Sequence, residues 1–512
     1  MELEGILAGL DLLLSPGALI YLVVGLVAGF VTGVLPGFGS SNATAVALSL
    51  SLALPVEQAL VLMISIYAGS TYGGSVPAIL LNVPGEAGSA ATAMDGYPLA
   101  QQGKGAMAIG VARLASALGG VISMVIVLAI IAPLSQAALL FGAREMLLVV
   151  AFGVVIVAGV VADSPGKGML SATMGLLLAA MSASPTTGQA RFTLGMIELY
   201  EGVPIVPALI GLFGFSQMFE LAASRSLFTQ GGSISTTTTP KGSGLRGFVR
   251  RSGEEVGQGF AETLQYPRTI VRSSLLGMII GVIPGMGASV GNFVGWAAAR
   301  RASKNPELFG KGAPEGVIGS EAADNGVASG TLVPMLTLGI PGSGTGAVMI
   351  AALILHGVAP GPRVMVEFEA EAYAVLLGAL VASILILPLG ILLAAPITGI
   401  TRVTPQILVP LILVISAAGV YASRGLMFDV WMTFVFGLLG YAMTRYEYPL
   451  VPMVLGLVLG PIGEQYLMRA LLLGRGQLSY FFGSPTAIVL WILLVALIVV
   501  TVLRVLRKRA AR

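Results

Sequence analysis

Two Pro-Gly segments interrupt stretches of sequence that are otherwise apolar enough to lie inside a membrane. They are Leu35-Pro36-Gly37-Phe38-Gly39-Ser40-Ser41-Asn42 and Ile283-Pro284-Gly285-Met286-Gly287-Ala288-Ser289. Proline removes a backbone donor and glycine weakens a helix, so backbone groups freed in hydrocarbon need protein, water or a ligand as partners. Broken helices at matching positions of two halves are typical of binding sites near the middle of the bilayer.

The composition places the chain among polytopic membrane proteins. Of its 512 residues, 56% are apolar and 10% are charged, and the mean hydropathy is +0.93. A soluble protein carries roughly 25% charged residues. Apolar runs such as Val375–Ile397 and Ala487–Leu503 approach the roughly 20 residues that span a bilayer. We therefore expect an all-α polytopic membrane protein with about ten to twelve membrane segments, some of them broken or re-entrant.

Several classes of site are excluded or disfavoured by residue usage. The absence of cysteine excludes a disulfide framework and a thiolate metal site, and the single histidine, His356, excludes a His-based metal site. A proton relay through histidine would have to use this one residue. We expect no cofactor, and no nucleic-acid partner, because no basic stripe carries interleaved aromatic residues. Met1-Glu2-Leu3-Glu4 lacks a basic n-region, so we expect no removable signal peptide.

The least membrane-like part of the chain is the segment 224–272. It combines a Gly/Ser/Thr-rich stretch with Arg246, Arg250, Arg251, Arg268 and Arg272, and the positive-inside rule places it in the cytoplasm. The tail from Arg504 to Arg509 is also basic, so we expect a cytoplasmic C-terminus. Some basic loops do face outward, and an external loop remains the alternative. We divide the chain into a first membrane half, 1–223, the central loop, 224–272, and a second membrane half, 273–512.

The two halves resemble each other internally. Pro36 aligns with Pro284 at a spacing of 248, whereas Pro77 aligns with Pro334 and Asn82-Val83-Pro84-Gly85 aligns with Gly339-Ile340-Pro341-Gly342, both at a spacing of 257. Small hydroxyl residues follow the second break of each half. The pattern predicts two repeat-related halves, and repeats of this kind in the membrane are commonly inverted.

A set of motifs carries a family resemblance. The chain resembles the large permease subunit of the tripartite tricarboxylate transporter family, most densely over about 30–110 and 275–365, through Pro36-Gly37, Tyr72-Gly73-Gly74-Ser75, Asn82-Val83-Pro84-Gly85, Asp95-Gly96-Tyr97-Pro98, Ala313-Pro314-Glu315-Gly316-Val317, Glu321-Ala322-Ala323 and Gly339-Ile340-Pro341-Gly342-Ser343. The resemblance implies a multi-pass subunit of the bacterial inner membrane that works with a small membrane subunit and a periplasmic solute-binding protein. It implies uptake of citrate or other carboxylates, driven by an ion gradient without ATP. Asp324-Asn325 departs from the Asn-Asn pair expected in the family.

The residues at the breaks are the candidate substrate site. Helix N-termini with free N–H groups supply positive potential to a carboxylate, and glycine lets the backbone approach it. Small residues also favour close helix packing, which is the alternative explanation for each of them. The candidates are Pro36, Gly37, Gly39, Ser40, Ser41, Asn42, Asn82, Pro84, Gly85, Ser89, Pro284, Gly285, Gly287, Ser289, Pro341, Gly342, Ser343 and Thr345.

The candidate ion-coupling residues are Thr44, Asn292, Glu321, Asp324 and Asn325. Acids at membrane depth are functional hypotheses by default, and two acids three positions apart share a helix face. Neutral oxygens suit sodium and an acid suits either sodium or a proton, so both cations remain open. The alternative is that both acids lie at a helix end near the membrane surface. Asp95-Gly96-Tyr97-Pro98 is typical of an ordinary surface turn.

We therefore expect secondary active, cation-coupled uptake of a tricarboxylate or related carboxylate, delivered by a periplasmic binding protein to an alternating-access subunit. The alternatives are a carboxylate channel and an intramembrane enzyme. An enzyme would need a nucleophile with a base, or a metal, and the sequence presents no convincing motif for either. We therefore predict that the chain is not an enzyme.

Overall fold

The computed structural model describes residues 2–35, 38–161, 164–184, 188–223, 245–284, 287–400 and 405–510. This part of the chain is almost entirely helical, and the strands β1 (Ser182–Ala183) and β2 (Ala190–Arg191) form one short antiparallel pair. The expected all-α class is confirmed. Pro36, Gly37, Gly285, the side chain of Ser289 and residues 224–244 of the expected loop lie outside the described part.

The elements of the first half precede the segment 224–244. They are α1 (Glu2–Leu14), α2 (Pro16–Val34), α3 (Gly39–Ser51), α4 (Val56–Leu81), η1 (Ala87–Ser89), α5 (Ala90–Leu99), η2 (Ala100–Lys104), α6 (Gly105–Leu139), α7 (Ala143–Ile156), η3 (Val157–Val161), α8 (Pro165–Ala179), η4 (Ile197–Leu199), α9 (Ile205–Leu209), η5 (Ile210–Phe215) and α10 (Ser216–Ala223).

The remaining helices follow that segment. They are α11 (Leu245–Thr263), α12 (Pro267–Val282), α13 (Gly287–Ala302), η6 (Pro306–Leu308), α14 (Pro314–Leu338), α15 (Gly344–Leu355), α16 (Val364–Glu367), α17 (Glu369–Ile400), α18 (Pro405–Arg424), α19 (Met427–Arg445), α20 (Leu450–Leu473), η7 (Leu478–Phe482) and α21 (Pro485–Ala510).

Eight helical segments of the described chain are long and apolar enough to cross a membrane. The helices α15 and 409–424 are apolar but shorter, and α14, which carries Glu315, Glu321 and Asp324, is not among the eight. The expected ten to twelve segments stay a prediction. The eight are Pro16–Val34, Val56–Leu81, Ala87–Leu139, Ile205–Ala223, Glu369–Gly390, Met427–Arg445, Leu450–Leu473 and Pro485–Leu503.

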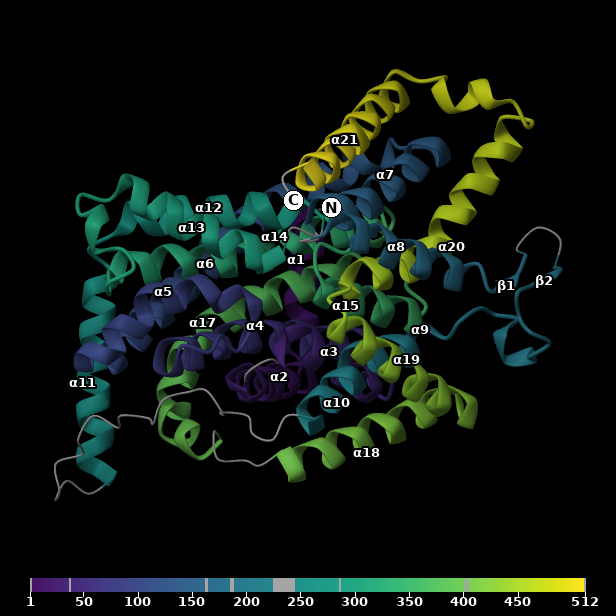
Figure 1. Cartoon of the computed structure of the whole chain (residues 1–512). Helices are drawn as coiled ribbons and strands as arrows, with labels where there is room; N and C mark the ends of the chain where they lie inside the picture. The colour runs from purple at the N-terminus through teal and green to yellow at the C-terminus, as the bar shows by residue number, and fades with distance from the viewer. Residues whose placement is uncertain are drawn as a thin grey trace.

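The helices α6, α12, α13 and α14 run side by side, and α11 stands across their ends (Figure 1). α11 begins inside the segment that the sequence predicted to be a polar loop. It packs on α6 through its less polar positions, since Val256, Gly259 and Thr263 are buried or in backbone contact there.

α21 has few contacts with the rest of the protein. Only 17% of its apolar stretch is buried inside the described structure. Its exposed apolar side chains are those of a helix that faces lipid.

Glycine lets α2 approach α4, and α12 approach α14, in the same way. A Cβ added to Gly29 would lie 2.2 Å from the carbonyl oxygen of Ile66, and one added to Gly277 would lie 2.0 Å from that of Ala323. Gly29 and Gly277 are 248 positions apart, whereas Ile66 and Ala323 are 257 apart. These are the spacings of the Pro-Gly breaks. The two glycine contacts therefore recur at the same sequence spacings as the breaks.

We predict that Gly29→Ala and Gly277→Ala each lower the free energy of unfolding by about 1–3 kcal/mol, because the added methyl group forces two helix backbones apart. Thermal unfolding of the protein in detergent measures the change. Gly166→Ala is the matched control, since a Cβ there meets nothing within 4 Å. A variant at Gly29 or Gly277 that unfolds with the control would show that the packing is looser than described.

Candidate functional site

The first break of each half has the same local geometry. α2 ends at Leu35, whose N–H donates to the carbonyl of Thr32, and α12 ends at Ile283, whose N–H donates to the carbonyl of Ile280, both at 3.1 Å. The next helix then begins with a glycine of positive φ, +51° at Gly39 and +58° at Gly287. Both breaks thus use a residue that tolerates the left-handed region.

The second breaks of the two halves also share one local geometry. α4 contains Pro77 and ends at Asn82 with φ of 58°, and α14 contains Pro334 and ends at Gly339 with φ of 69°. In both cases the N–H groups of the cap residue and of the residue after it donate to the proline carbonyl. Asn82 is exposed and caps α4, so the structure assigns it a clear architectural role, while its predicted contact with substrate stays a prediction.

The first break of the first half meets the second break of the second half. The hydroxyl of Thr345, on α15, lies 3.0 Å from the hydroxyl of Ser40 and 3.2 Å from that of Ser41, both on α3. A Cβ added to Gly344 would lie 2.6 Å from the Ser41 hydroxyl. Three predicted site residues therefore form one hydroxyl cluster, the α3–α15 cluster of Ser40, Ser41 and Thr345, in which Thr345 is more than 300 positions from the two serines.

The second break of the first half likewise meets the first break of the second half. The amide of Asn292, on α13, donates to the carbonyl oxygens of Ala87 and Gly88 in η1. Its Oδ1 is buried without a hydrogen-bond partner, and so is the hydroxyl of Ser89. The arrangement is crossed, because each half contributes one break to each of the two contacts.

The other predicted residues of the breaks form local hydrogen bonds or are described by their burial. The Ser343 hydroxyl accepts from the N–H of Gly346 at 3.1 Å and caps α15, and the Thr44 hydroxyl donates to the carbonyl of Ser40 at 2.7 Å. The N–H of Gly85 donates to the carbonyl of Gly74 at 3.1 Å. Asn42 donates to Gln217 at 3.5 Å. Pro84 is half-buried, and Pro284, Pro341 and Gly342 are buried.

The two acids of α14 are both fully buried but have different surroundings. Glu321 accepts hydroxyl hydrogen bonds from Thr92 at 2.5 Å and from Ser116 at 2.6 Å, one on each carboxylate oxygen. Neither oxygen of Asp324 has a hydrogen-bond partner. Asn325 donates its amide to the carbonyl of Glu321 at 3.2 Å. Both acids lie well inside α14, at 0% exposure, so neither lies at a helix end, as the alternative explanation required.

Glu86 is a third acid of this region, which the sequence analysis did not select. It follows the Pro84-Gly85 break directly, and its Oε1 accepts from the Ser40 hydroxyl at 2.6 Å, while its Oε2 is buried without a partner. Its position in the sequence was a usable signal, because a lone acid beside a break in an apolar stretch is a functional candidate.

Asp95 does not lie in a surface turn, contrary to the sequence-based expectation. It is fully buried in α5. Its Oδ2 accepts from the indole N–H of Trp296 at 2.7 Å. Its Oδ1 accepts from the backbone N–H groups of Gly310, Gly312 and Ala313 at 2.7–3.1 Å. The acid satisfies buried donors of the loop before α14, and the Asp-Gly-Tyr-Pro pattern continues the helix because that tertiary contact outweighs its turn propensity.

Arg113, on α6, is a second residue that the sequence analysis missed. It is 1% exposed, and its Nε and Nη1 have no hydrogen-bond partner. Its guanidinium lies 5.8 Å from the ring centroid of Tyr72, and a Cβ on Gly390 would lie 3.0 Å from its Nε. A buried cation in a membrane protein is a functional hypothesis by default, and the signal was its isolation in an apolar run.

His356 follows α15 directly. Burial lowers the pKa of its imidazole. Its Nε2 is buried without a hydrogen-bond partner.

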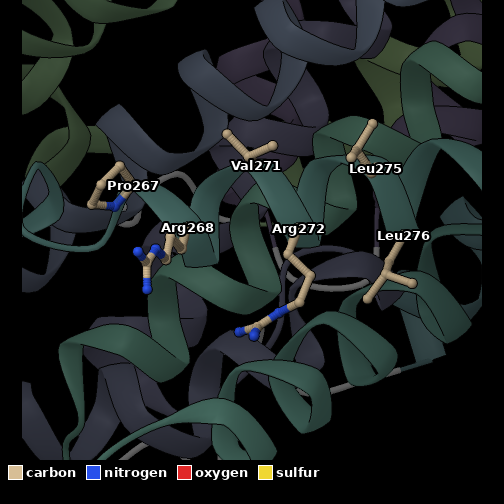
Figure 2. Close-up of a pocket in the computed structure, with 6 residues that line it drawn as sticks. All are labelled: Pro267, Arg268, Val271, Arg272, Leu275 and Leu276. Carbon is tan, nitrogen blue, oxygen red and sulfur yellow. The ribbon is translucent and has the colours of Figure 1, made fainter.

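A groove of about 600 Å³ lies along α12, away from the breaks. It is lined by Pro267, Arg268, Val271, Arg272, Leu275 and Leu276, with the two arginines extending from the same side of the helix (Figure 2). No predicted substrate or ion residue lines it, so the groove is not the candidate site.

Comparison with known proteins identifies relatives. A family model described as the tripartite tricarboxylate transporter TctA family matches residues 19–455. An uncharacterized 52.8 kDa protein of Agrobacterium vitis, named for the TAR-I ttuC′ 3′ region, is 32% identical over 509 residues, which cover 98% of this chain and 96% of the relative. A second, from the TAR-II ttuC′ 3′ region, is 35% identical over 211 residues, covering 41% of this chain and 87% of the relative. No solved structure matches.

We predict that Asp95→Ala lowers the free energy of unfolding by about 3 kcal/mol and that Trp296→Phe lowers it by about 1 kcal/mol, since buried donors lose their acceptor in the first case and one hydrogen bond is lost in the second. Thermal unfolding in detergent measures both. Asp11→Asn, on an exposed position of α1, is the control. If Asp95→Ala unfolded at the temperature of the control, the acid would not hold this loop.

Proposed function

Because the chain belongs to the tripartite tricarboxylate transporter TctA family, it is a membrane subunit of a tricarboxylate transporter, and we propose that it takes up a tricarboxylate or related carboxylate by coupling to a cation gradient. The observation that carries this proposal is the crossed contact of the breaks, in which Ser40 and Thr345 lie 3.0 Å apart. Family membership favours transport over enzymatic catalysis.

The substrate site in this proposal is the α3–α15 cluster with the adjoining helix starts. The hydroxyls of Ser40, Ser41 and Thr345 are neutral donors, and the first N–H groups of α3 and α15 lie beside them. A helix N-terminus with a polar cap favours an anion without a permanent counter-ion. A carboxylate held in this way can be released again, which a transport cycle requires.

Charge balance supports coupling to a cation. Glu86, Glu321 and Asp324 place three acids in this region, and Glu86 hydrogen-bonds the same Ser40 that would meet the substrate. An ionised acid repels an approaching carboxylate, and a low-dielectric interior strengthens the repulsion. A cation or proton bound at these acids removes the repulsion. The carboxylate therefore binds more tightly when the cation is bound, and this coupling of affinities is the thermodynamic basis of symport.

The partners and topology follow the family resemblance. We propose a bacterial inner-membrane location, a small membrane subunit, a periplasmic solute-binding protein that delivers the substrate, and cytoplasmic placement of the central loop and C-terminus. We also propose that the two halves are inverted repeats that alternate access around the crossed breaks. The matched caps and matched glycine contacts of the halves support this arrangement.

Uptake into proteoliposomes tests the proposal. The vesicles contain this chain and its small membrane partner, with and without the binding protein, under imposed sodium or proton gradients, and radiolabelled citrate and other carboxylates are supplied. We expect gradient-driven uptake that requires the binding protein. Downhill flux independent of gradient and binding protein would instead indicate a channel.

We predict that Thr345→Val lowers carboxylate uptake by at least about tenfold, because the α3–α15 cluster loses the hydroxyl that joins the two halves. Thr337→Val is the matched control, since the Thr337 hydroxyl bonds only to the carbonyl of Val333 at 2.7 Å within α14. The initial rate of uptake at saturating gradient measures both. Equal rates in the two variants would remove the cluster from the substrate site.

We predict that Asp324→Asn and Glu321→Gln each change the dependence of uptake on cation concentration, because each removes a charge that the cation would neutralise. The measurement is the initial uptake rate against sodium concentration and, separately, against external pH. If both variants kept the wild-type dependence on both cations, neither acid would take part in coupling.

A further inference from the structure

Asp324 is the least satisfied acid in the described part of the chain. It is fully buried, and both carboxylate oxygens lack a hydrogen-bond partner, whereas Glu321, one turn away, receives a hydroxyl on each oxygen. Its carboxylate is directed at η1, since a Cβ added to Gly88 would lie 2.3 Å from Oδ1 and 2.7 Å from Oδ2. A buried carboxylate without donors needs a cation or a proton.

Further unpartnered oxygens surround the same short helix. Glu86 and Ser89 flank η1, and Asn292 contacts it from α13 through its amide nitrogen. Glu86 Oε2, Ser89 Oγ and Asn292 Oδ1 are all buried without a hydrogen-bond partner. Glu86 is also close enough to Asp324 to interact with it electrostatically. With the two oxygens of Asp324, the four side chains on and around η1 carry five buried oxygens without a hydrogen-bond partner.

We propose that Glu86, Ser89, Asn292 and Asp324 form a sodium site around η1, an inference that rests on the proposed cation-coupled transport and names its cation and ligands. Hard cations take oxygen ligands. A single proton would satisfy one of the five oxygens, whereas a metal ion satisfies several at once. Calcium takes roughly six to eight oxygens and magnesium keeps several of its waters, whereas these four side chains offer five unpartnered oxygens.

Glu86 connects this site to the substrate. Its Oε2 belongs to the sodium site, while its Oε1 accepts from the Ser40 hydroxyl, which in turn contacts Thr345 at 3.0 Å. Sodium at Oε2 withdraws charge from the whole carboxylate. The Ser40 hydroxyl then becomes freer to turn toward a substrate carboxylate. One side chain thus carries the effect of the cation to the α3–α15 cluster.

Direct binding of radioactive sodium to the purified full chain in lipid nanodiscs tests the site without any substrate or transport. We expect saturable sodium binding, and Glu86→Gln and Asp324→Asn each to weaken it by at least about tenfold, as loss of a metal ligand does. Gly88→Ala should abolish it, because the methyl group occupies the position next to Oδ1. Ser89→Ala is the further test if an acid variant fails to fold, because it removes an unpartnered hydroxyl at little structural cost. It should also weaken sodium binding.

Glu315→Gln is the matched control, because Glu315 is a buried acid of the same helix whose Oε1 accepts from Thr269 at 2.7 Å, outside the proposed site. It should bind sodium like the wild type. Sodium binding that survives in the Glu86, Ser89, Gly88 and Asp324 variants would overturn this site while leaving cation-coupled transport intact. A wild-type chain that binds no sodium but takes up carboxylate under a proton gradient would likewise overturn it. Loss of gradient-driven uptake altogether would count against the proposed function instead.

Discussion

The need of every buried backbone group for a hydrogen-bond partner governs this structure. A helix break frees N–H and C=O groups, which need partners inside a membrane protein. Leu35 and Ile283 turn back onto their own helices, and Asn82 and Gly339 cap onto the carbonyl of an upstream proline. Beside these local contacts, the hydroxyls of Ser40, Ser41 and Thr345 meet across the two halves.

The crossed arrangement follows from how the halves pack. Glycine brings α2 onto α4 and α12 onto α14 at backbone contact, so the helices that carry the breaks of each half are closely packed. When the halves meet, α3 faces α15 and α13 faces η1. The hydroxyls of Ser40 and Thr345 then lie in one contact and the amide of Asn292 in the other. Gly29 and Gly277 serve packing, and the substrate role of the small residues at the breaks stays a prediction.

The buried charges of this region follow from the same packing. Glu321 accepts hydrogen bonds from two hydroxyls, and Asp95 accepts them from four N–H groups. Arg113 lies over an aromatic ring. Asp324 and one oxygen of Glu86, in contrast, have no hydrogen-bond donor. Burial of an unsatisfied charge is costly. In the proposed sodium site, the cation would be the partner that Asp324 and Glu86 lack. The same acids would repel a carboxylate in the absence of that cation.

The sequence alone determined the membrane class, the positions of the four breaks and the matched spacings of 248 and 257, because proline, glycine and long apolar runs act through local backbone physics. It also selected Asp324 and Asn292, since polar groups are rare in such runs. Only the tertiary structure decided which break meets which, that Asp95 is a buried acceptor, that Glu321 is satisfied, and that Glu86 joins Ser40. Those outcomes depend on contacts between segments hundreds of residues apart, and helix periodicity carries no information about them.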